Sequence, residues 1–135
     1  MKTIKVSQAE GHVLDWLVAK ALGESEDTLE SYVDGFRCAD EGAYSTDWAQ
    51  GGPIIEREGV NLSIDYQDDA LSNDMVQLGW KGNLWNNSVP GTAGFLQWAY
   101  GPTPLIAAMR CYVASKLGDE VDVPKEVAHG IGEAP

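Results

Sequence analysis

The sequence predicts an α+β fold in which a small antiparallel sheet of about four to five short strands packs with two main helices. Apolar residues recur at helical spacing near residues 12–23 and 103–118, and these two stretches predict the helices. Between them, residues 60–66 alternate apolar and polar side chains, which is the period of a strand with one buried face.

The first helix has a start signal, a buried face and a stop signal. Ser7 and Glu10 have the spacing of a capping box, which predicts that the helix begins there. Gly11 weakens the first turn, so the ordered helix can begin nearer His12. Gly23 is well placed as a left-handed C-terminal cap. The buried face is formed by Leu14, Leu17, Val18 and Ala21.

The middle of the chain predicts short strands separated by turns. Residues 32–38 contain enough β-formers for a short strand. Gly51-Gly52-Pro53 predicts a turn, with Pro53 at a first helical position and one or two helical turns over residues 54–58. Residues 60–66 and 75–80 then predict an antiparallel hairpin.

The second half predicts one long loop and the clearest helix. Residues 81–94 are rich in turn formers and predict an extended loop, followed by a strand over residues 95–100. Thr103 is a suitable N-cap for a helix that ends at Gly118, and residues 119–123 predict an edge strand. The buried stripe of this helix is formed by Leu105, Ala108, Met109, Tyr112 and Val113.

Length and composition indicate one cytosolic domain. The 135 residues fit a single domain, for which we expect residues 1–123, with a flexible tail over residues 124–135. No apolar run is long enough to cross a membrane, and the start lacks the apolar core of a secretion signal. Cys38 and Cys111 lack metal-ligand spacing, so we expect no disulfide, no metal and no cofactor.

The charge of the chain is strongly negative and unevenly distributed. The formal net charge is −12, and residues 24–74 hold 14 acidic residues and two basic ones. Such a segment repels phosphate backbones, so we expect no binding to duplex nucleic acid. It is either a solvated face that maintains solubility or a surface that mimics DNA and meets a basic protein.

No catalytic set is evident, so we predict no catalytic residues. Neither His12 nor His129 shares a segment with a recognisable nucleophile motif. Glu56 and Glu58 are two residues apart and would point to different sides of a helix. The Gly-Gly-Pro sequence lacks the Lys and Ser/Thr of a phosphate-binding loop.

The strongest candidate for a ligand surface surrounds Trp48. Hydrogen-bonding side chains crowd around this indole, and Gly51 and Gly52 permit close approach of a ligand to the backbone. Trp80, Trp85 and Trp98 lie near strand ends, where an indole can stack on a planar ligand. The alternative is that these tryptophans close a small core.

Two arginines are candidates for holding an anion. Arg57 and Arg110 can grip a phosphate or carboxylate, assisted by free N–H groups at the helix start near Thr103. For Arg110, an ion pair with an acidic neighbour is the alternative. The predicted ligand-binding set is Ser45, Thr46, Asp47, Trp48, Gln50, Gly51, Gly52, Arg57, Trp98, Tyr100, Thr103 and Arg110.

Three segments together resemble the NinX family of temperate-phage proteins, which are encoded in the nin region of lambda-like phages. The segments are residues 14–21, 45–59 and 101–118, and they come in the family's order. The resemblance implies a small accessory protein made in the cytoplasm of an infected bacterium. It implies no settled biochemical activity.

In that context we expect a non-enzymatic protein that binds and sequesters a small nucleotide-derived signal of host defence, as a homo-oligomer. Trp48 and a second aromatic residue would stack on the base, while Arg57 and Arg110 hold the anionic part. The alternative is an acidic inhibitor or DNA mimic that binds a host defence protein through residues 24–74. An enzyme acting on a nucleotide is a third hypothesis.

Overall fold

The computed structural model describes residues 2–25, 29, 43–68, 75–87, 90–91, 93–124 and 127, with only the backbone described at residues 66–68 and 75–78. Three α-helices and five strands form an α+β fold, which confirms the predicted class. In chain order the elements are β1 (Lys2–Lys5), the 3-10 turn η1 (Val6–Gln8), α1 (Gly11–Ala21), α3 (Trp48–Glu58), β2 (Asn61–Asp68), β3 (Met75–Asn86), β4 (Phe95–Gly101), α4 (Pro104–Leu117) and β5 (Glu120–Val123).

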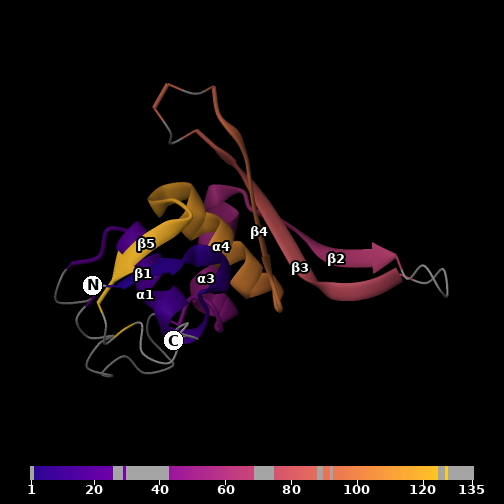
Figure 1. The fold of residues 1–135 in the computed structure, drawn as a ribbon, viewed down its shortest axis with the longest axis horizontal. Helices are drawn as coiled ribbons and strands as arrows, with labels where there is room; N and C mark the ends of the chain where they lie inside the picture. The colour runs from indigo at the N-terminus through magenta and orange to yellow at the C-terminus, as the bar shows by residue number, and fades with distance from the viewer. Residues whose placement is uncertain are drawn as a thin grey trace.

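The strands form two antiparallel sheets, whereas the sequence predicted one. β2, β3 and β4 pair in that order, and β1 pairs with β5. The helices lie between the two sheets, and the β2–β3 hairpin extends away from them (Figure 1). The predicted edge strand became β5, but its partner β1 was not predicted because the pairing joins the two ends of the chain and leaves no local signal.

Helix α4 is the centre of the molecule. Residues 105–115 are all buried, including Arg110 and Ser115. The helix packs on β3 and β4 and against α1 and α3. The predicted cap is confirmed, because Thr103 Oγ1 accepts a hydrogen bond from the N–H of Ile106 at 3.1 Å. The predicted single buried stripe was too narrow, because neighbours cover this helix on all sides.

Helix α1 confirms the predicted stop signal and corrects the predicted start. Ser7 lies in η1, and Glu10 precedes the helix without making a side-chain cap, so the capping box is absent. At the other end, Gly23 has a φ of +83°, and its N–H bonds to the carbonyl of Lys20 at 3.0 Å. The N–H of Glu24 bonds to Ala19, which completes a Schellman motif.

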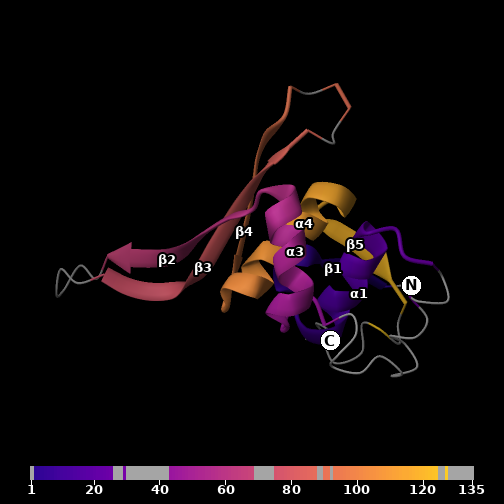
Figure 2. The same ribbon diagram turned by 180° about the vertical axis from the view of Figure 1, so that it is seen from behind.

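The Gly-Gly-Pro sequence is helical, so the predicted turn is wrong. Asp47 caps helix α3 by accepting from the N–H of Ala49 at 2.9 Å, and the helix continues through Pro53 to Glu58. This cap lies six residues before Pro53, so the proline is not at a first helical position. Figure 2 shows α3 in front of α4, on the face opposite that seen in Figure 1.

The second error in the sequence prediction concerns β3. The 60–66 and 75–80 hairpin is confirmed, but β3 continues to Asn86, so the first six residues of the predicted 81–94 loop are strand. They pair in register with β4, from Lys81 opposite Tyr100 to Asn86 opposite Phe95. The predicted strand at 32–38 lies outside the described residues. So does most of the predicted tail, although Val127 is buried.

Gly51 provides a test of how α3 meets α4. A Cβ at Gly51 would lie 2.6 Å from Leu105 Cδ1 and would also collide with the carbonyl oxygen of Tyr44. We therefore expect Gly51→Ala to lower the free energy of unfolding by about 1–3 kcal/mol, as overpacking does.

Gly52→Ala is the matched control, measured by the same urea titration. Apart from its chain neighbours, a Cβ at Gly52 meets nothing within 4 Å; the gain of up to about 1 kcal/mol from alanine in a helix is opposed by contact with the Pro53 ring, so this variant should lose less stability than Gly51→Ala. Equal effects of the two substitutions would contradict the close packing at Gly51.

Candidate functional site

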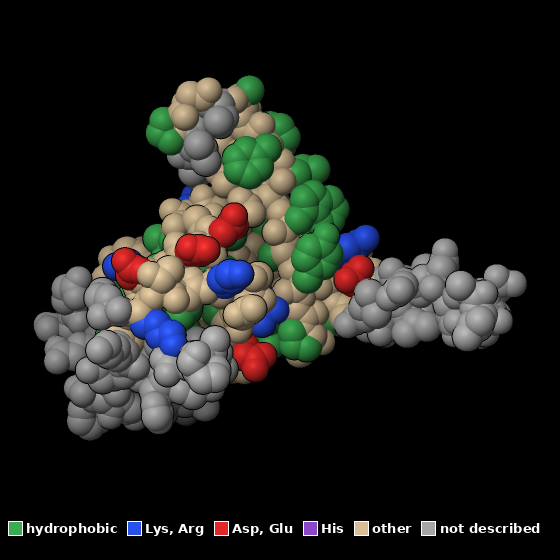
Figure 3. Space-filling view, in the orientation of Figure 1, with side chains coloured by type: hydrophobic (Ala, Val, Ile, Leu, Met, Phe, Trp, Pro, Cys, Tyr) green, Lys and Arg blue, Asp and Glu red, His purple; other side chains and the backbone are tan. Residues whose placement is uncertain are grey.

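A groove of about 530 Å³ lies between β4, the edge strand of the three-stranded sheet, and the β1–η1 junction and start of β5 in the two-stranded sheet. Its volume is in the range of small-molecule sites, roughly 300–1,000 Å³. Apolar side chains gather along β3 and β4 on this face, with charged side chains on the side of β5 (Figure 3). The groove is lined by Lys5, Val6, Ser7, Asp65, Gly79, Trp80, Trp98, Ala99, Tyr100, Gly101, Arg110, Ala114, Asp119 and Glu120.

Two glycines shape one end of the groove. Gly79 has a φ of +150°, and a Cβ there would lie 2.7 Å from the carbonyl oxygen of Gly101. A Cβ at Gly101 would lie 2.8 Å from the backbone nitrogen of Ala107 in α4. The strand ends and the start of α4 therefore approach each other because neither position carries a side chain.

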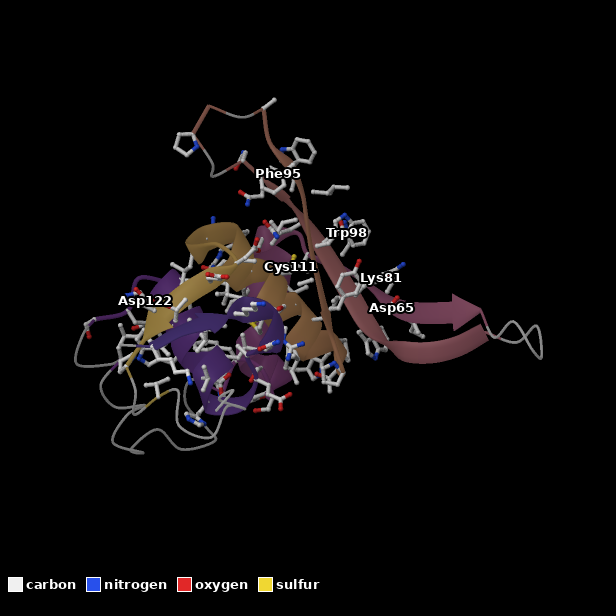
Figure 4. The ribbon with its side chains drawn as sticks, in the orientation of Figure 1. Asp65, Lys81, Phe95, Trp98, Cys111 and Asp122 are labelled. Atoms are coloured by element: carbon white, nitrogen blue, oxygen red, sulfur yellow. The ribbon has the colours of Figure 1, made fainter. Side chains whose placement is uncertain are left out.

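Three aromatic residues supply the planar surfaces of the groove. Trp98 and Tyr100 are two apart on β4, so both point to the same side of the sheet, where they are 44% and 53% exposed. Trp80 lies on β3 and is half-buried. Lys81 Nζ lies 6.0 Å from the centre of the Trp98 ring, and Figure 4 shows the two side chains together. Such rings can stack on a planar ligand.

Arg110 contributes a buried cation to the wall of the groove. It is 8% exposed, and it donates from Nε to the carbonyl of Ala9 and from Nη1 to that of Tyr100, each at 2.8 Å. These bonds use two of its five N–H donors. Burial lowers the pKa of the guanidinium, and the Glu10 carboxylate opposes this shift.

The ion pair predicted for Arg110 is present but long. Nη2 of Arg110 and Oε2 of Glu10 are 3.9 Å apart, and the Glu10 side chain is exposed. The buried charge is thus weakly compensated by the protein, and an anionic group in the groove would face it. Lys5 adds a second cation, while Asp65, Asp119 and Glu120 make the rest of the lining acidic.

The groove lining combines acidic, basic, hydroxyl and aromatic side chains. The lining residues named above include no histidine or cysteine. Cys111 lies in the core behind the sheet (Figure 4), and burial raises the pKa of its thiol to about 12, so this thiol is not a nucleophile at neutral pH. The described residues hold no group of three side chains suited to a metal ion.

The structure brings three of the predicted ligand-binding residues together: Trp98, Tyr100 and Arg110 all line the groove. Thr103 caps α4 and does not line the groove. Arg57 pairs with Glu58 at 2.9 Å on α3, and this hydrogen bond is the main cause that raises the pKa of Arg57. Of the two predicted arginines, Arg110 lines the groove and Arg57 does not, and a shared role of the two in holding an anion stays a prediction.

The polar residues near Trp48 bond mainly to their own segment. Gln50 donates to Asp47 and accepts from the N–H of Ala43, while Asp47 also caps the helix. These hydrogen bonds hold the pKa of Asp47 below its ordinary value, with the Gln50 bond as the largest cause. Trp48 itself is exposed, and none of residues 45–57 lines the groove. Ligand binding by the predicted residues outside the groove stays a prediction; they are Ser45, Thr46, Asp47, Trp48, Gln50, Gly51, Gly52, Arg57 and Thr103.

Ser45 has a structural position. It is buried, and its N–H donates to Asp15 Oδ1 at 2.8 Å, which joins the segment before α3 to helix α1. Ser45 Oγ is the buried polar side-chain atom without a hydrogen-bond partner among the described residues. Burial raises the pKa of Asp15, and the adjacent Ser45, which donates its N–H to this carboxylate, opposes that shift.

Sequence reasoning missed Lys5, Ser7, Asp119 and Glu120 as lining residues. They lie where β1 meets η1 and where β5 begins, and the bond from the N–H of Val6 to the carbonyl of Asp119 holds these junctions together at 2.9 Å. No local pattern reveals such a pairing of distant segments. Trp80 was recognised as an aromatic able to stack but was not included in the predicted set.

The chain belongs to the family described as "Bacteriophage P22, NinX", whose family model matches residues 5–116. The resemblance noted from three sequence segments is thereby confirmed. No curated protein matches the chain. Within the described part of the chain, none of the helices has the length and apolar character needed to cross a membrane.

The buried Asp15 predicts a pH-dependent difference between two variants. Because the pKa of Asp15 is raised above its ordinary value of 3.8, the folded state is penalised for holding the charged form, and the penalty is relieved as pH falls through the raised pKa. Asparagine keeps the acceptor for Ser45 without the charge. We expect Asp15→Asn to be at least as stable as the wild type near pH ~7, with the difference shrinking toward pH ~4.

Asp15→Ala is the matched comparison in the same denaturant titrations. It leaves the buried N–H of Ser45 without an acceptor and should cost about 1–3 kcal/mol at neutral pH. If the asparagine variant loses as much stability as the alanine variant, desolvation of the carboxylate is not the dominant effect at this position.

Proposed function

We propose that this NinX-family protein binds a small nucleotide-like molecule in the groove beside β4 and, without chemical conversion, sequesters it from a host defence system. The observation that supports the proposal is a buried, weakly compensated guanidinium in a groove at the edge strand β4, whose lining also includes exposed aromatic residues. Arg110 supplies the cation, and Trp98 and Tyr100 supply the rings.

The charge of the groove limits the kind of ligand. Two cations, Arg110 and Lys5, face three acidic side chains along the lining. A polyanion would be repelled by these acids and by the chain's net charge of −12. A ligand with one planar ring and a compact anionic group, placed near Arg110, fits this distribution best.

The three aromatic residues can hold a base in more than one way. Trp98 and Tyr100 expose half of their surface on one side of β4, while Trp80 comes from the inner side of β3 at the glycine-lined end. Because Trp98 points to the outer side of the sheet and Arg110 lies on α4 at the inner side, a ligand stacked on Trp98 would reach Arg110 around the edge strand β4. Stacking tolerates every base, so hydrogen bonds from the polar lining would set the ligand's identity.

The test is isothermal titration calorimetry with a panel of cyclic nucleotides and ADP-ribose-type nucleotides. We expect one class to bind, and Trp98→Ala to weaken its affinity about 5- to 150-fold through the loss of stacking. Higher salt should weaken binding, because the Arg110 and Lys5 contacts are electrostatic. Chromatography of the recovered ligand should return it unchanged.

Trp48→Ala is the matched control, because Trp48 is equally exposed but lies on α3. This substitution should leave the affinity unchanged. If the Trp48 variant loses binding and the Trp98 variant keeps it, the ligand site is the one predicted from residues 45–57 and the groove is not. Absence of heat across the whole panel at high micromolar protein would overturn the proposal.

A further inference from the structure

The outward side of the three-stranded sheet carries a continuous apolar surface. We call it the outer sheet face. The register places Trp85 opposite Leu96, Asn83 opposite Trp98 and Lys81 opposite Tyr100, all on the same side. The alternate residues Leu84 and Ala99 are buried toward α4. The outer sheet face is therefore the side of the sheet that α4 leaves uncovered.

The exposure of this face is high for large apolar side chains. Trp85 is 59% exposed and Leu96 48% exposed, beside the half-exposed rings of Trp98 and Tyr100. With aromatic side chains of about 150–250 Å² each, these fractions leave roughly 400 Å² of neighbouring apolar side-chain surface in water. Patches of this size on soluble proteins commonly mark interaction sites. Figure 3 shows the corresponding apolar side chains as a band along β3 and β4.

We propose that the outer sheet face is the contact between two copies of this chain. The inference does not require the ligand proposed above, although Trp98 and Tyr100 belong to both surfaces; Trp85 and Leu96 do not line the groove. Two copies facing each other would bury roughly 800 Å² from the four apolar side chains, and the polar residues around them bring the contact to the lower end of stable interfaces, about 1,200 Å².

The charges on the face fit a second copy better than a basic protein. Lys81 and Asp65 lie on the same side of the sheet, next to Trp98 (Figure 4). Asp65 pairs with Gly79, two residues from Lys81, so the two opposite charges are offset along the strand direction. A two-fold rotation brings the Lys81 of one copy toward the Asp65 of the other, which makes the face complementary to itself.

The salt dependence of association distinguishes a second copy of this chain from a basic protein partner. These two charges balance, although the chain carries −12 overall, so its excess of negative charge lies elsewhere. Two copies repel each other at long range, and salt screens that repulsion while leaving apolar burial intact. A complex with a basic protein would instead weaken as salt rises.

Sedimentation equilibrium of the full chain tests the proposal. We expect a dimer at about 100 μM that does not dissociate between ~50 and ~500 mM NaCl. Leu96→Glu places a carboxylate of each copy in the buried contact and should weaken the dimer at least ~10-fold, because an unpaired buried charge is costly.

Trp48→Glu is the matched control: it also replaces an exposed apolar residue, but on α3, and should leave the dimer intact. Thermal unfolding of each variant, measured at a concentration low enough for it to be monomeric, checks that the fold is kept. A wild-type chain that stays monomeric at this concentration overturns the proposal. A dimer that survives Leu96→Glu places the contact elsewhere and overturns it as well.

Discussion

Helix α4 is enclosed along residues 105–115 and touches α1, α3 and the three-stranded sheet. Water cannot satisfy the polar side chains of such a helix, so they must bond to the protein. Arg110 does so by holding the carbonyls of Ala9 and Tyr100, and Ser115 by donating to the carbonyl of Tyr112. The Arg110 bonds join the segment before α1 to the end of β4. The wall of the groove is thus fixed by the same contacts that close the core.

The sequence predicted those elements whose signals are local. The 60–66 alternation, the Thr103 cap and the Gly23 stop signal each depend on residues within a few positions of one another. Two predictions that relied on turn-forming residues are wrong. Gly51 and Gly52 are helical because Asp47 caps α3 ahead of them and because Leu105 leaves no room for a side chain at Gly51. Gly82 lies in β3 between Leu62 and Ala99, and a Cβ there would lie 3.2 Å from Leu62 Cδ2, so this glycine marks close packing and not a turn. In both cases tertiary packing determined the conformation.

The candidate site was predictable only in part, for the same reason. Trp98 was predicted because an indole near a strand end can stack on a planar ligand, and Arg110 because an arginine stands out in an acidic chain; Tyr100 was part of the same predicted set. The residues around Trp48 were predicted to bind a ligand because many of them are polar. In the structure Asp47 and Gln50 bond to each other and to backbone N–H groups, and Asp47 caps α3. The residues from β1, η1 and β5 required the pairing of the two chain ends, which no window of sequence contains.

The groove and the outer sheet face share Trp98 and Tyr100, so the proposed ligand and the proposed dimer contact together predict a link between ligand binding and assembly. A ring stacked on Trp98 changes the surface that a second copy meets, and a second copy changes the surroundings of the ligand. Linkage requires the two effects to be equal: the factor by which the ligand changes the dimer affinity is the factor by which dimerisation changes the ligand affinity. Substitutions at Leu96 and Arg110 can distinguish ligand binding from dimerisation. Leu96 lies on the outer sheet face and does not line the groove, whereas Arg110 lines the groove and does not lie on that face. A protein that holds its ligand at the border of a self-complementary surface can therefore use its own concentration to set how tightly it retains that ligand.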